Sequence, residues 1–203
     1  MRVKVYIPAA LLLTLLVISI APQARADSVQ SREYQIKAAF LCNFVKFVDW
    51  PAGKLADANQ PVTIGIIGKD PFGKAFESGA GKIFVKRFGS FEVLKKTSQN
   101  DKAAWEQKLA DLKKCHLLFI CDSEKSGFKE ILDSLKNHPV LTVADTKGFI
   151  EAGGVINLLL EEQKVRFEVN VTAAKQHNIQ IRSKLLRLAK RVVEEKRQED
   201  VKD

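Results

Sequence analysis

The chain has 203 residues, of which 46% are hydrophobic and 28% are charged. That length suffices for one domain with its own hydrophobic core, so neither a disulfide nor a metal is needed to hold it together. The formal net charge is +9, but the cations are interspersed with acids and lack the interleaved aromatic residues of single-strand binders, so we expect no nucleic-acid partner. A solvated surface is the favoured interpretation of this charge, and attraction to acidic membrane lipid is the alternative.

The first 26 residues have the three parts of a secretory signal peptide. Arg2 and Lys4 give a positive start, residues 7–21 form an almost unbroken apolar run, and Ala24 and Ala26 place small side chains where a signal peptidase cuts. An apolar run of roughly fifteen residues is shorter than the about 20 that a membrane-spanning helix needs, which favours cleavage over an uncleaved anchor. We expect residues 27–203 to form a single mature domain outside the cytoplasm.

Residues 29–49 predict the first long helix. Apolar side chains recur there at three- and four-residue steps from Tyr34 to Val48, and Trp50-Pro51 is expected to end the helix. The polar face is expected to hold Lys37, Asn43 and Lys46.

Strands and helices then alternate, which predicts a sheet covered by helices on both faces. We expect strands at residues 62–67, 83–85, 117–120 and 140–143, and helices from Asp70 through Phe76, at residues 101–113 and at residues 125–137.

The pattern changes after Gly153-Gly154. Residues 155–160 and 165–169 are two extended runs joined by a short polar link, which predicts a β-hairpin at one side of the sheet. Asn170 or Thr172 is expected to start a short helix, residues 185–193 to form a last amphipathic helix, and residues 194–203 to fray. The predicted fold class is therefore α/β, with a mixed, mostly parallel sheet flanked by helices.

The three cysteines form no CxxC pair. Cys115 and Cys121 flank the predicted strand at residues 117–120, which would place them about 20 Å apart and prevent a disulfide between them. Buried free thiols are favoured, and a bridge from Cys42 to either cysteine stays open. We expect no metal site and no cofactor.

Residues 68–74 spell GxxxxGK between a predicted strand and helix, the place of a phosphate-binding loop. The chemistry argues against that function. Pro71 has no N–H to offer, Asp70 adds negative charge, and Ala75 lacks the hydroxyl that would hold Mg²⁺. A plain turn capped by Asp70 is favoured.

Three aspartates follow predicted strands: Asp70, Asp122 and Asp145. In a parallel sheet the carboxyl ends of the strands meet at one crevice, where a small ligand could bind. The alternative is that each aspartate merely caps a helix or turn. His116, His138 and His177 lie in no catalytic motif, so we expect no catalytic residues and no enzyme.

Four segments of the chain are informative when taken together. They are EYQIKAAFLCNF (33–44) running to Trp50-Pro51; GKDPFG (68–73); CHLLFI (115–120); and GGVIN (153–157) running through VRFEVN (165–170) to SKLLRLA (183–189). Together they resemble the YfiR family of periplasmic proteins, and the resemblance covers nearly the whole expected mature chain in order.

This resemblance implies an α/β domain without catalysis that represses the periplasmic part of an inner-membrane diguanylate cyclase. It also implies that an OmpA-like outer-membrane lipoprotein can sequester the repressor. Cyclic-di-GMP and biofilm formation would fall as a result. Some relatives are sensor modules of histidine kinases, so a small-ligand sensor acting on another membrane signalling protein is the alternative function.

The cysteines depart from the better-known relatives. Some relatives pair a cysteine at the position of Cys115 with one in the preceding strand, where Gly65 stands here. A further pair near the Gly153-Gly154 hairpin has no counterpart. Redox control by disulfides is therefore not expected.

Polar or aromatic residues inside the resembling segments are the candidates for partner binding. They are Asn43, Lys46, Trp50, Arg166, Asn170 and Arg182; the alternative is that they pack, cap or remain solvated. A homodimer through the long first helix is a further expectation.

Overall fold

The computed structural model describes residues 21–55, 60–77, 83–91 and 102–194. Most of the expected signal peptide and the charged tail beyond Glu194 lie outside these ranges. Among the described residues, no helix is long and apolar enough to cross a bilayer.

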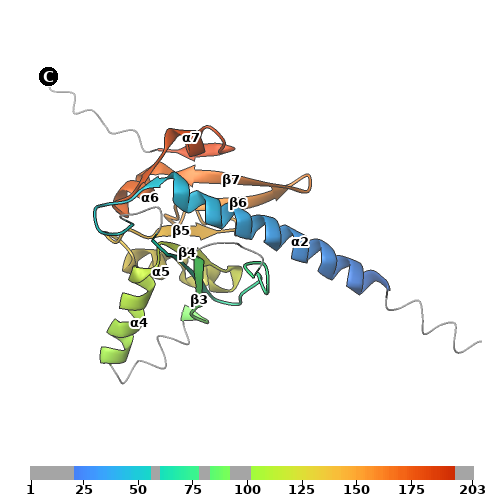
Figure 1. The fold of residues 1–203 in the computed structure, drawn as a ribbon, viewed down its shortest axis with the longest axis horizontal. Helices are drawn as coiled ribbons and strands as arrows, with labels where there is room; N and C mark the ends of the chain where they lie inside the picture. The colour runs from blue at the N-terminus through green and yellow to red at the C-terminus, as the bar shows by residue number, and fades with distance from the viewer. Residues whose placement is uncertain (1–20, 56–59, 78–82, 92–101, 195–203) are drawn as a thin grey trace, which may run out of the picture.

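A seven-stranded sheet forms the centre of the fold (Figure 1), in the order β3-β2-β4-β5-β6-β7-β9. Its strands are β2 (Val62–Ile67), β3 (Ile83–Arg87), β4 (Leu117–Ile120), β5 (Leu141–Ala144), β6 (Ile156–Glu161), β7 (Lys164–Asn170) and β9 (Arg191–Val193). Neighbouring strands are parallel except β6 and β7, which pair antiparallel. The structure confirms a single α/β domain with a mixed, mostly parallel sheet.

Helices cover both faces of this sheet. They are α2 (Ala21–Phe44), α4 (Lys102–Lys114), α5 (Phe128–Ser134), α6 (Val171–Gln176) and α7 (Ser183–Leu186), with 3₁₀ turns η1 (Val45–Phe47) and η2 (Asp122–Gly127). A separate two-stranded antiparallel sheet joins β1 (Val48–Asp49) to β8 (Gln180–Ile181). Figure 1 shows α2 running across the sheet, with its N-terminal part extending beyond the strands.

Alternating side chains of the buried strands point to opposite faces of the sheet and pack into two separate hydrophobic cores. Leu117 and Phe119 of β4 join the core that α2 and α6 cover, whereas Leu118 and Ile120 join the core under α4 and α5. Because both faces are covered, β4 is apolar at all four positions, as buried parallel strands are. This explains why β4 was predictable from its apolar run alone.

The β6–β7 hairpin is confirmed. Its two loop residues, Glu162 and Gln163, have φ values of 47° and 60°, as a type I′ hairpin turn requires. Asn170 starts α6 as predicted, because its side-chain oxygen accepts a hydrogen bond from the N–H of Ala173 at 2.9 Å. Thr172 does not start this helix.

The first helix ends earlier than predicted, at Phe44 instead of residue 49. Val48 pairs with Ile181 in the small β1–β8 sheet, and the N–H of Arg182 donates to the carbonyl of Phe47. Pairing with a segment more than 130 residues away therefore ends the helix and puts the backbone in an extended conformation before Trp50-Pro51.

The helix expected from Asp70 through Phe76 is replaced by turns. Asp70 caps the turn, since its Oδ1 accepts from the N–H of Phe72 at 2.7 Å. Gly73 has a φ of 50°, which an α-helix cannot continue.

The last amphipathic helix was also predicted wrongly. The helix α7 ends at Leu186, and Arg191–Val193 form the edge strand β9, parallel to β7. The open edge of β7 supplies backbone partners there, and Arg191 Nε donates to the Glu168 carboxylate at 2.6 Å. The hairpin is consequently not the edge of the sheet.

Candidate functional site

A pocket of about 690 Å³ lies where α2 crosses the C-terminal ends of β4 and β5 and reaches β6 and β7. The residues that define its chemistry are Glu33, Tyr34, Lys37, Asp122, Asp145 and Glu168. The pocket thus brings the expected crevice of the parallel strands together with the first long helix.

Lys37 is the central cation of this site. Its Nζ lies 2.5 Å from Glu33 Oε1 and 2.5 Å from Asp145 Oδ2, and only 5% of its side chain is exposed. Tyr34 donates its hydroxyl to the same Asp145 oxygen at 3.0 Å, and its ring lies 4.4 Å from the Lys37 ammonium. The sequence analysis grouped Lys37 with Asn43 and Lys46 on the polar face of the helix, but Lys37 is buried whereas the other two are exposed.

The cluster is arranged for structure more than for proton transfer. Burial, followed by the Asp145 carboxylate, raises the pKa of Tyr34 well above its ordinary value. A tyrosine that stays protonated can donate a hydrogen bond but cannot serve as a base near neutral pH. Its hydroxyl and the Lys37 ammonium compensate the buried Asp145 charge.

The three aspartates do not form one site. Asp122 and Asp145 line the pocket, whereas Asp70 binds the guanidinium of Arg87 at 2.5 Å and is not among the lining residues. Asp70 and Asp145 both contribute to the raised pKa of the buried Cys121 thiol, about 12, of which burial is the main cause. They therefore lie at the same edge of the sheet, each with its own cation.

Within the described part of the chain, no group of three His, Cys, Asp or Glu side chains could hold a metal ion. Cys42, Cys115 and Cys121 are free thiols, the last two buried, as expected. Burial raises the pKa of Cys115 to about 11, so this thiol is poorly nucleophilic.

The GxxxxGK segment uses its backbone internally. The N–H of Gly68 donates to Gly89, and the N–H of Lys69 donates to the Ser123 hydroxyl at 2.9 Å. Gly68 has a φ of 101°, and a Cβ there would lie 2.5 Å from Ser123 Oγ. The close approach of η2 therefore explains why a glycine stands at position 68, and no phosphate is needed to explain it.

Three partner-binding candidates lie together on one surface. Arg182 donates to Asp49 Oδ1 at 2.7 Å and to the carbonyl of Lys46 at 3.1 Å, and Lys46 donates to Asn43 Oδ1 at 3.1 Å. All of these side chains are exposed. The β1–β8 pairing creates this surface from two distant segments.

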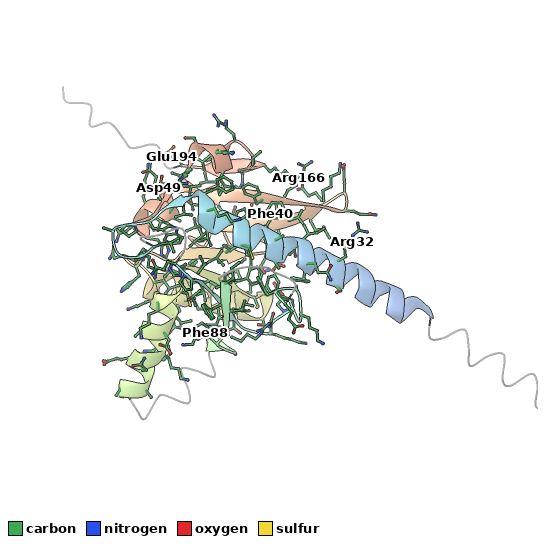
Figure 2. All side chains as sticks on the ribbon, viewed as in Figure 1. Arg32, Phe40, Asp49, Phe88, Arg166 and Glu194 are labelled. Carbon is green, nitrogen blue, oxygen red and sulfur yellow. The ribbon has the colours of Figure 1, made fainter. Side chains whose placement is uncertain are left out.

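The other three candidates are separate. Trp50 is half-buried, donates to the Val45 carbonyl at 3.2 Å and packs edge-on against His116. Asn170 is buried and donates to the Ile150 carbonyl besides capping α6, so its side chain is occupied within the fold. Figure 2 shows Arg166 along the hairpin, away from Asp49, and its side chain is exposed.

Sequence reasoning missed Tyr34 and Lys37 as site residues. The helical period did place Tyr34 on the buried stripe, which was a usable signal. Glu33, four residues before Lys37, indicates only a local helical ion pair; the burial of Lys37 could not be predicted, because its second partner, Asp145, is 108 residues away.

These observations define a domain whose pocket is internally charge-paired and whose mixed sheet carries an added parallel edge strand. The chain belongs to the YfiR/HmsC-like family, whose model matches residues 34–190. Proteins of this family are periplasmic and regulatory, with a role in cyclic-di-GMP signalling.

Two solved structures resemble the fold. A conserved domain protein from Vibrio cholerae O1 biovar El Tor has a TM-score of 0.53 at 10% identity, covering 79% of this chain and 60% of its own. An ABC domain from Streptococcus pneumoniae, crystallised with L-Trp, has a TM-score of 0.49 at 12% identity, with coverages of 74% and 61%. The chain thus spans about three fifths of both structures. No curated protein matches it.

Proposed function

We propose that this protein is a periplasmic repressor that holds an inner-membrane diguanylate cyclase in its inactive state by protein–protein contact. Cyclic-di-GMP and biofilm formation then fall. The observation that carries the proposal is the family match over residues 34–190.

The mechanism is differential affinity for two states of the cyclase. A ligand that binds both states equally shifts nothing, and moving a population from 1:99 to 99:1 requires about 5.5 kcal/mol of preference. The repressor must therefore contact a surface that differs between the active and inactive cyclase.

The surface formed by Asn43, Lys46, Asp49 and Arg182 is the proposed contact. Its geometry supports this role, because the Arg182 bonds to Asp49 and to the Lys46 carbonyl fix the side chain before binding. A preorganised arginine loses less conformational entropy on association. Trp50 and Arg166 are secondary candidates.

Residues 1–26 are proposed to be a cleaved signal peptide, and residues 27–203 the mature YfiR-like domain. Cleavage frees the repressor to exchange between the cyclase and an OmpA-like outer-membrane lipoprotein. The long first helix, α2, is the proposed surface for a homodimer, through the part that follows Ala26; Figure 1 shows this helix extending beyond the sheet.

Deletion of the protein, followed by nucleotide measurement and affinity recovery from solubilised membranes, tests this function. Deletion is expected to raise cyclic-di-GMP, and the wild-type protein to recover a cyclase. Arg182→Glu should lose the cyclase, whereas Lys129→Glu, in the exposed Lys129–Asp133 pair on α5, should retain it. Unchanged nucleotide together with no recovered cyclase would refute the proposal.

The pocket favours a second candidate function, a small-ligand sensor acting on a membrane signalling protein. Its volume of about 690 Å³ falls in the range of small-molecule sites. Asp122 and Asp145 line this pocket, while Asp70 lies outside it. A thermal-shift screen of periplasmic solutes tests it, because a ligand at about 100 times its dissociation constant adds about 2.7 kcal/mol of stability.

A further inference from the structure

The turn that follows β8 combines exposed cations with an exposed leucine. The helix α7 continues past its last residue as a helical turn, since Arg187 N–H donates to Ser183 and Leu188 N–H donates to Leu185. Lys184, Arg187 and Leu188 are therefore three and four residues apart on one helical face. Leu185 faces the core, whereas Leu188 is 66% exposed.

Among the residues that the structure describes, no acid pairs with the charges on this face. Within the described residues, neither Lys184 nor Arg187 forms an ion pair; Lys184 lies 5.8 Å from the ring of Phe47. The neighbouring acids are already engaged: Asp49 with Arg182, Glu161 with Lys190 and Glu194 with Lys175. The face therefore keeps a net positive charge around one apolar side chain.

We propose that this α7 face, made of Lys184, Arg187 and Leu188, docks on an anionic phospholipid bilayer. Lys184 and Arg187 would bind the lipid phosphates, and Leu188 would enter the boundary between the headgroups and the acyl chains. A protein partner fits the face less well, because protein interfaces are depleted of lysine and centre on an aromatic or arginine anchor held in a pocket.

Such docking is weak and reversible, since it uses few charges and one apolar side chain. It places the neighbouring Arg182 surface near the plane of the membrane. This inference does not depend on the proposed repression, because a bilayer without any protein is a sufficient partner.

Vesicle flotation of the purified periplasmic protein tests the proposal. The probe is phosphatidylethanolamine vesicles with or without phosphatidylglycerol. We expect flotation only with phosphatidylglycerol, and its loss near 1 M salt, where the screening length is about 3 Å.

Two variants locate the contact. Lys184→Gln/Arg187→Gln should weaken binding roughly 30-fold, because each basic residue near an anionic surface contributes about 1 kcal/mol. Leu188→Ser should weaken binding about tenfold. Full burial of a leucine side chain contributes about 1.5–3 kcal/mol, and the substitution removes part of this contribution.

The matched control is Lys108→Gln/Lys125→Gln, which removes the same amount of charge. Lys108 is exposed on α4, and Lys125 is exposed in η2, the turn before α5. Figure 1 shows α4 at the end of the molecule away from α7. This control should bind like the wild type. Equal loss in the control, or binding that needs vesicles carrying membrane proteins, would overturn the proposal in favour of general charge attraction or a protein contact.

Discussion

Lys37 in α2 and Asp145 after β5 form a buried ion pair across 108 residues of sequence. Their charged atoms are 2.5 Å apart, and their side chains are 5% and 8% exposed. The pair fixes α2 to the carboxyl end of the parallel strands, and so links the first helix to the pocket.

Removing one member of this pair should destabilise the fold strongly. Lys37→Met leaves the Asp145 carboxylate buried without its cation, at a cost of about 3–5 kcal/mol. Asp145→Asn should cost less, because Glu33 still pairs with Lys37 and the amide oxygen still accepts from Tyr34. Urea unfolding measures both losses.

The double variant Lys37→Met/Asp145→Asn should be more stable than Lys37→Met alone, since no uncompensated Asp145 charge remains. Lys129→Gln, which breaks an exposed pair on α5, should change the free energy of unfolding by less than about 1 kcal/mol. Additive losses in the double variant would mean that the two charges are not coupled.

Tyr34 should resist ionisation until the protein unfolds. The chain has two tyrosines, Tyr6 and Tyr34, so a mature chain cleaved after Ala26 reports Tyr34 alone by its absorbance near 295 nm. Its folded pKa lies above that of the unfolded chain, about 10. The corresponding stability is complete below pH 10 and is lost as pH rises further. Absorbance should rise together with the loss of circular dichroism; an earlier rise would contradict the buried hydroxyl.

Most of the buried strands were predictable because burial between two layers of helices restricts their composition. A parallel strand buried on both faces is mainly apolar: β4 is apolar at all four positions, and β2 and β5 each include a single threonine, Thr63 and Thr142. The Glu162-Gln163 turn was likewise local, fixed by a polar link of hairpin length.

Two of the errors, at the end of α2 and at β9, have a common physical origin in long-range pairing, whereas the turns that replace the helix after Asp70 are local, because Gly73 has a φ of 50°. The end of α2 depends on Val48 meeting Ile181, and β9 depends on the open edge of β7. The same is true of the site, because burial of Lys37 is favourable only where Asp145 arrives. Helical period alone assigns a lysine to solvent, so no local pattern could have identified this pair.

Stability should fall on mild acidification. His116 Nδ1 accepts from the N–H of Thr63 at 3.0 Å while Nε2 bonds the carbonyl of Lys54 at 2.9 Å, which fits a neutral ring. Burial lowers the pKa of His116 and of His177. Because both folded pKa values lie below the unfolded value of about 6.5, the stability is complete above pH 6.5 and is lost as pH falls.

Urea midpoints measured from pH 8 to pH 5 test this dependence. His116→Gln and His177→Gln should each flatten the profile, because each removes one group that gains a proton on unfolding. His138→Gln is the matched control for His116→Gln, because the His138 ring bonds the nearby Lys136 carbonyl. A flat wild-type profile would contradict the role of both buried rings.

Gly65→Cys should form a disulfide with Cys115. A Cβ built at Gly65 lies 2.9 Å from Cys115 Sγ, which matches the separation of about 3 Å between the Cβ of one cysteine and the sulfur of the other in a disulfide. Closing the intervening loop should stabilise the oxidised variant by roughly 4 kcal/mol relative to its reduced form. Non-reducing mass spectrometry and urea unfolding with and without reductant measure both effects.

Gly65→Ser is the control: its Cβ also meets Leu118 Cδ1 at 2.8 Å, so it should be destabilised with no response to reductant. If the Gly65→Cys protein keeps the thiols of residue 65 and Cys115 free after treatment with an oxidant, β2 and the end of α4 lie farther apart than a disulfide allows.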